Sequence, residues 1–266
     1  MNGFFRLTIV CLKRAIFNVR FLSMVILLAL CELLNVLPRI IDSAYWLNGR
    51  LYFGTTIIDL LFAEGATLMF CCTLIIPLVP YSCSLCDDVK NGMITSIVIK
   101  SGRYRYAIAT ALAVAISGFV CVFLGETLFM SVCSIFVDIC RPERLQNYTF
   151  VSLMEGKPLL FLFFKIMLKA LRGSFFALIA LLISVYVKNR YLILALPVLI
   201  YYFLSYFGYF YLKLPVYFDV VAIFFAYVFE PRSISEGYSI LYAFACTLLT
   251  GFLTAALVAK GVKKCY

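Results

Sequence analysis

The sequence predicts an all-α integral membrane protein, a bundle of six transmembrane helices, and two observations support this. First, 65% of the 266 residues are hydrophobic and only 14% are charged, whereas a soluble protein of this length needs a far larger polar surface. Second, the apolar residues form long stretches separated by short polar breaks, and most Lys and Arg lie in alternate breaks. Because backbone polar groups inside a bilayer must be satisfied within the protein, we expect these stretches to pack as helices in one domain over residues 1–266.

An amphipathic segment over residues 1–20 precedes the first apolar stretch. Arg6, Lys13 and Arg20 recur at a regular heptad spacing and therefore share one helical face. Apolar residues occupy the opposite face: Phe4, Cys11, Ala15 and Val19. This pattern predicts an interfacial helix on the inner leaflet of the membrane. The alternative is a plain helical extension of the first span.

Six apolar stretches have 17 or more residues, which falls within the length range of transmembrane helices. They cover residues 21–37, 65–81, 106–137, 159–187, 191–211 and 238–259. Pro38 is expected to end the first of them, because proline removes a helical hydrogen bond.

A further apolar run over residues 216–229 lies between Pro215 and Pro231. A helix of this length reaches about 21 Å, which is short of the hydrocarbon core. A seventh span would also place the basic C-terminus outside the cell. We therefore expect an outer re-entrant segment over residues 212–237, before the last span.

The distribution of charge predicts that both termini are cytoplasmic. With six spans, four segments face the cytoplasm: residues 1–20, 82–105, 188–190 and 260–266. They hold 13 of the 23 Lys and Arg but only two of the 13 Asp and Glu, in agreement with the positive-inside rule. The net charge of +10 therefore indicates topology and contact with anionic membrane lipids, and we expect no nucleic-acid partner.

The residues needed for common catalytic and metal sites are missing from the sequence. The chain has 11 Cys and no His, and Cys83 and Cys86 form a lone CxxC pair without the second pair or His that a zinc site needs. No glycine-rich loop followed by Lys and Ser or Thr is present to cradle the phosphates of ATP. We therefore expect no catalytic residue, no metal site and no bound cofactor.

The most organised motif lies in the 82–105 segment. It contains two acids, a glycine, a short apolar stretch and a basic turn, carried in order by Asp87, Asp88, Lys90, Gly92, Met93, Ile97, Lys100 and Arg103. The motif resembles the cytoplasmic coupling region of permease subunits of ATP-binding-cassette (ABC) transporters of the type-2 exporter class. The interfacial helix, the six spans and the re-entrant segment before the last span are similar to the layout of that class.

This resemblance implies a permease subunit of the bacterial plasma (inner) membrane. It would work with a second permease chain, identical or homologous, and with ABC ATPase subunits that bind ATP and Mg. Residues 87–100 would form a coupling helix that the ATPase receives. Gly92 would permit the sharp turn before it, and Arg103 and Arg105 would anchor the next span at anionic headgroups. The alternative is an ordinary basic loop that serves topology alone.

Ionisable residues inside the predicted spans are candidates for a transport path: Glu32, Glu126, Lys169 and Arg172. A charge at membrane depth is costly and commonly faces the bundle interior or water. For the two acids, the alternative is a position near the outer interface. The basic residues share one helical face with Lys165, and we favour the interpretation that they snorkel to outer headgroups. Alternatively, they line an outer cavity.

Three classes of function remain after these exclusions. The first is the permease of an ATP-driven exporter, as the resemblance implies. The second is an ATPase-independent secondary transporter or channel, which would contain inverted repeats or paired charges inside the membrane. A membrane enzyme is the third, because the sequence contains no evident pair of nucleophile and base.

Overall fold

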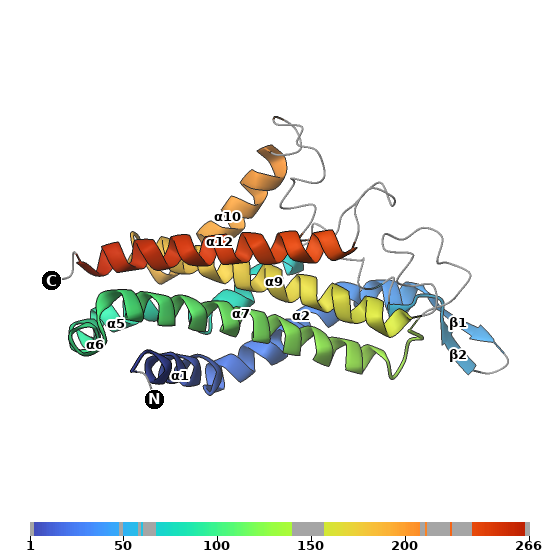
Figure 1. The fold of residues 1–266 in the computed structure, drawn as a ribbon. Helices are drawn as coiled ribbons and strands as arrows, with labels where there is room; N and C mark the ends of the chain where they lie inside the picture. The colour runs from blue at the N-terminus through green and yellow to red at the C-terminus, as the bar shows by residue number, and fades with distance from the viewer. Residues whose placement is uncertain are drawn as a thin grey trace.

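Four long helices run side by side and form the body of the protein (Figure 1). The computed structural model describes residues 3–47, 50–57, 60, 68–139, 157–207, 211, 224 and 236–263. The long helices are α2 (Val19–Asp42), α7 (Arg103–Cys133), α9 (Pro158–Ser184) and α12 (Glu236–Lys263). Each of them is long and apolar enough to cross a membrane. The prediction of a helical, multi-pass membrane protein is confirmed at this level, with four of the six expected spans.

The other two expected spans correspond to shorter helices. Residues 65–81 contain α4 (Leu68–Ile75), followed by the 3-10 helix η1 (Ile76–Leu78). Pro77 lies in η1, where it cannot donate the hydrogen bond that would continue α4. The fifth stretch forms α10 (Arg190–Tyr206), whose 17 residues reach about 26 Å.

The first span is longer than expected, since α2 continues past Pro38 to Asp42. Proline removes a single donor here, and the following turns form their own hydrogen bonds, as the backbone N–H of Ser43 does with the carbonyl of Arg39 at 3.1 Å. The prediction that Pro38 ends the helix is therefore wrong.

The N-terminal segment is a helix of its own, α1 (Gly3–Ile16). A bend at Phe17 and Asn18 separates it from α2, and the Asn18 side chain caps α2 by accepting a hydrogen bond from the Arg20 backbone N–H at 3.2 Å. This excludes a plain extension of the first span. The predicted apolar face of α1 is buried at Cys11 and Ala15, but Val19 belongs to α2 and is 83% exposed.

The two ends of the bundle differ in character (Figure 1). One end carries the start of α1, the end of α12 and two short helices, α5 (Ser84–Lys90) and α6 (Met93–Ser101). We call it the basic end, because the cations of the predicted cytoplasmic segments gather there. At the opposite end a hairpin of β1 (Ala44–Leu47) and β2 (Arg50–Phe53) follows α2.

The hairpin was not expected in an all-α fold. Its strands are antiparallel, with Ala44 opposite Phe53 and Tyr45 opposite Tyr52. The rings of the two tyrosines stack with centroids 5.9 Å apart. Such cross-strand aromatic pairs stabilise a short ladder that is too brief to show a clear alternating pattern in the sequence.

The predicted re-entrant segment over residues 212–237 lies largely outside the described residues. Of its apolar run only Phe224 is described, and this side chain is buried with its ring centroid 5.0 Å from that of Phe175 on α9. The prediction of a re-entrant segment therefore stays a prediction.

Small residues set the close approach of α7 and α9. A Cβ atom added at Gly118 would lie 3.0 Å from the backbone oxygen of Gly173, and one added at Gly173 would lie 2.5 Å from Val122 Cγ2. Helices in membranes commonly pack through such small residues, because these let the backbones approach. The α7–α9 contact thus leaves no room for a methyl group at these positions.

We predict that Gly173→Ala destabilises the protein by about 1–3 kcal/mol, because the added methyl group meets the stiff side chain of Val122. Gly251→Ala is the matched control, since a Cβ there would lie 3.7 Å from Leu178 Cδ1, an ordinary contact. The measurement is the midpoint of thermal unfolding in detergent, followed by circular dichroism. Equal midpoints for the two variants would contradict the tight α7–α9 contact.

Candidate functional site

The motif-bearing segment forms a pair of short helices at the basic end. Gly92 joins α5 to α6 with φ of 65°, and Gly102 joins α6 to α7 with φ of 82°. Both values lie in a region that residues other than glycine rarely adopt. The turn predicted at Gly92 is confirmed. The expected coupling helix over residues 87–100 is instead split between α5 and α6.

Helix α6 has an anchored face and an exposed face. Ile94 and Val98 are buried against the bundle, and Ile97 is half-buried. Met93 and Ile99 are exposed, Ile99 by 74%. Figure 1 views α6 almost along its own axis, whereas the long helices run across the page, so α6 lies crosswise at the basic end.

Asp88 is the centre of a buried polar contact between three helices. Its side chain is 2% exposed. One carboxylate oxygen accepts a hydrogen bond from Arg14 Nη2 of α1 at 2.9 Å, and the other accepts one from the Tyr106 hydroxyl of α7 at 2.8 Å. Asp88 therefore ties α5 to α1 and α7.

Asp87 makes a second tie from the neighbouring position of α5. It forms an ion pair with Arg190, the first residue of α10. Consecutive residues of a helix point about 100° apart, which explains why the two acids reach different helices. Both carboxylates bond within the chain, and the three partners Arg14, Tyr106 and Arg190 were not singled out from the sequence.

The remaining motif residues lie at the surface of the basic end. Lys90 and Lys100 are exposed at the ends of α5 and α6. Arg103 lies over the ring of Tyr104, with 4.8 Å between the guanidinium carbon and the ring centroid. These residues are therefore available to headgroups or to a partner.

A second group of functional candidates lies inside the bundle. Glu126 of α7 and Lys169 of α9 form a buried ion pair, in which Lys169 Nζ lies 3.1 Å and 3.2 Å from the two carboxylate oxygens. Their side chains are only 1% and 5% exposed. Both ions have lost their contact with solvent, so the pair depends on its own geometry for stabilisation.

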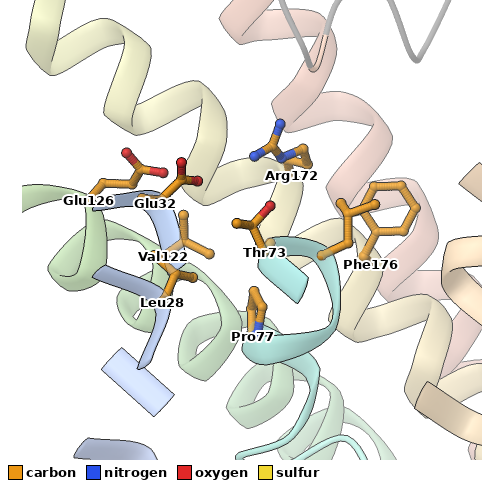
Figure 2. Close-up of a pocket in the computed structure, with 10 residues that line it drawn as sticks. Leu28, Glu32, Thr73, Pro77, Val122, Glu126, Arg172 and Phe176 are labelled. Atoms are coloured by element: carbon orange, nitrogen blue, oxygen red, sulfur yellow. The ribbon is translucent and has the colours of Figure 1, made fainter. Parts of the chain in front are cut away.

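The two other candidates line a small cavity beside this pair (Figure 2). Glu32 of α2 lies next to Glu126, and Arg172 of α9 lies on the other side of the cavity, with Thr73 of α4 between them. The cavity has room for about one water molecule. The structure thus brings all four predicted transport-path residues, from three different spans, into one polar cluster.

The burial of the basic residues contradicts the snorkelling interpretation. Lys165, Lys169 and Arg172 are all buried inside the bundle and do not lie at its outer surface. For Lys169 the physical reason is that Glu126 on α7 offers it a polar partner within the protein. Arg172 lines the small cavity inside the bundle, and the alternative of an outer cavity stays a prediction.

Burial disfavours the thiolate form of both cysteines in the CxxC pair. Burial raises the pKa of Cys83 to about 11, with further contributions from Cys86 and Asp87. Burial also raises the pKa of Cys86. The thiolate is the form that binds metals and attacks disulfides. Within the described residues, no group of three or more Cys, Asp or Glu is placed to hold a metal ion.

We predict that Asp88→Asn lowers the free energy of unfolding by about 1–3 kcal/mol, because a buried acceptor of two hydrogen bonds loses its charge. Asp87→Asn, the neighbouring control, removes a more exposed ion pair and is expected to cost less than about 1 kcal/mol. Thermal unfolding of both variants in the same detergent gives the comparison. If Asp87→Asn lowers the stability as much as Asp88→Asn, the buried Asp88 contact does not stabilise the protein more than the exposed ion pair does.

We predict strong coupling between Glu126 and Lys169. Glu126→Gln leaves the Lys169 charge buried without its carboxylate and is expected to cost about 3–5 kcal/mol. Lys169→Met is expected to cost a similar amount, whereas the double variant should lose far less than the sum. The readout is a double-mutant cycle on unfolding in detergent. Additive losses would show that the two residues do not form an ion pair.

The comparisons with known proteins name no family for this arrangement. No protein-family model, curated protein or solved structure matches the chain.

Proposed function

We propose that the chain is the membrane-spanning permease subunit of an ATP-driven ABC exporter. The observation that carries this proposal is α6, a short helix at the basic end that is bounded by two glycines of positive φ and exposes apolar side chains. We take Met93 and Ile99 as the residues that another protein would cover. In this proposal the partner is a separate ATPase subunit, which binds ATP and Mg.

The ties made by α5 explain how such a partner would act on the spans. Asp88 links α5 to α1 and α7, and Asp87 links it to α10. Gly102 is the only residue between the end of α6 and the start of α7. A displacement of α6 by the partner would therefore be transmitted to α7 and α10, because no long flexible loop separates the short helices from them.

The buried polar cluster is the proposed transport path. Glu32, Glu126, Lys169 and Arg172 come from α2, α7 and α9, and charged residues inside a membrane commonly mark such paths. The cavity beside them is too small for a substrate. Alternating access would widen it when the partner ATPase closes, in a complex of two permease chains in the bacterial plasma membrane with both termini cytoplasmic.

The test is affinity purification of the tagged full chain from its native host in mild detergent, with identification of co-purifying proteins and measurement of ATPase activity. We predict that a P-loop ATPase co-purifies with the wild type. Ile99→Asp is expected to reduce its recovery at least about tenfold, because a charge is placed in the centre of the interface. Ile135→Asp is the matched control, since Ile135 is 72% exposed, close to the 74% of Ile99, and follows α7 at the opposite end.

Two results would contradict the proposal. One is a wild-type preparation without any ATPase subunit. The other is equal recovery of the ATPase with the Ile99 and Ile135 variants, which would place the interface elsewhere.

An ATPase-independent secondary transporter is the second candidate, and the Glu126–Lys169 pair specifically favours it. Paired charges inside the membrane are common in proteins that couple transport to ion or proton movement. Reconstitution of the purified chain alone in proteoliposomes separates the two functions. Ion-gradient-driven transport without an ATPase would support the second candidate and exclude the first.

A further inference from the structure

A groove at the basic end lies apart from the polar cluster and from the exposed face of α6. Its walls come from α5 and α6 on one side and from the ends of α9 and α12 on the other. The walls are mainly apolar and include Leu85, Val89, Ile94, Val185 and Val262. The groove holds about 570 Å³ of empty space, part of it open to solvent.

Two lysines give this apolar groove a basic rim. Lys90, at the end of α5, and Lys188, between α9 and α10, both line the groove and are exposed. In the part of the chain that the structure describes, neither forms an ion pair, whereas the nearby Arg190 is held by Asp87. The free charge of the rim therefore comes from Lys90 and Lys188.

We infer that this groove binds an anionic phospholipid, with an acyl chain against its apolar walls and the phosphate between Lys90 and Lys188. A small soluble anion would gain nothing from the apolar walls, and a neutral hydrocarbon would gain nothing from the lysines. The groove lies where the long helices α9 and α12 end, which is the level of lipid headgroups for helices that cross a membrane.

A lipid in this position would bridge two parts of the molecule. Its acyl chain would contact Val89 and Ile94 from the short helices and Val185 and Val262 from the long ones. The bound lipid would therefore help to hold α5 and α6 against the bundle. The inference depends on the membrane location of α9 and α12 and is independent of the proposed ATPase partner.

The test uses the delipidated full chain in detergent and native mass spectrometry with three probes. These are dioleoyl phosphatidylglycerol, dioleoyl phosphatidylcholine and glycerol 3-phosphate, which carries the phosphate without acyl chains. We expect the anionic lipid to bind at least about fivefold more tightly than the zwitterionic lipid, and glycerol 3-phosphate to show no binding.

Two substitutions separate the rim from the walls. Lys90→Ala with Lys188→Ala is expected to weaken phosphatidylglycerol binding by roughly 25-fold, since each lysine near an anionic headgroup contributes about fivefold. Lys13→Ala with Lys100→Ala is the matched control, because both lysines are exposed at the same end without lining the groove. Val89→Phe is expected to weaken binding of both lipids by filling the groove.

Several outcomes would overturn the inference. An equal effect of the two double-lysine variants would indicate lipid that surrounds the whole protein. Binding of glycerol 3-phosphate as tight as that of phosphatidylglycerol would indicate a site for a free anion. If the wild type binds phosphatidylglycerol and phosphatidylcholine equally tightly, the groove is not an anionic-lipid site, and another protein or another part of this chain would be its occupant. Since the lysines are exposed, their variants decide the question even if Val89→Phe unfolds, and no outcome bears on the ATPase partner.

Discussion

The contact between α7 and α9 is the constraint on which the rest of the structure depends. Gly118 and Gly173 let the two backbones approach, and this approach fixes the register of the antiparallel pair. In that register Glu126, two turns beyond Gly118, meets Lys169, one turn before Gly173. The two glycines therefore determine which residues of α7 and α9 face each other, and this brings the two charged residues together. A shift of one turn would leave both charges buried in hydrocarbon without each other.

At the basic end, hydrogen bonds and ion pairs attach the short helix α5 to its neighbours. The carboxylates of Asp87 and Asp88 collect cations from α10 and α1, and the hydroxyl of Tyr106 completes the set. Both acids were expected to contact a partner ATPase. Their contacts within the chain give them a positioning role, and the exposed residues of α6 are Met93, Thr95, Ser96, Ile99 and Lys100.

Much of the fold could be predicted from the sequence, because long apolar stretches determine helices and glycines permit turns through residues that are close together in the chain. The bounds of α7 and α9 agree with the predicted spans to within a few residues, and the turn at Gly92 was expected. The charge pairs could not be predicted in the same way. Arg14 and Asp88 are 74 residues apart and Glu126 and Lys169 are 43 apart, so their meeting depends on helix packing. The snorkelling interpretation of Arg172 was wrong, because a pattern along one helix does not show which residues of neighbouring helices cover a side chain.

The separation of the two faces of α6 has a consequence for how such a protein can evolve. Ile94 and Val98 attach the helix to the bundle, whereas Met93 is 47% and Ile99 74% exposed. Substitutions on the outer face can therefore accumulate without disturbing the spans, and substitutions in the spans need not alter the outer face. A duplicated copy of the chain could therefore change the surface of α6 through a few codons while it keeps the packing of its long helices.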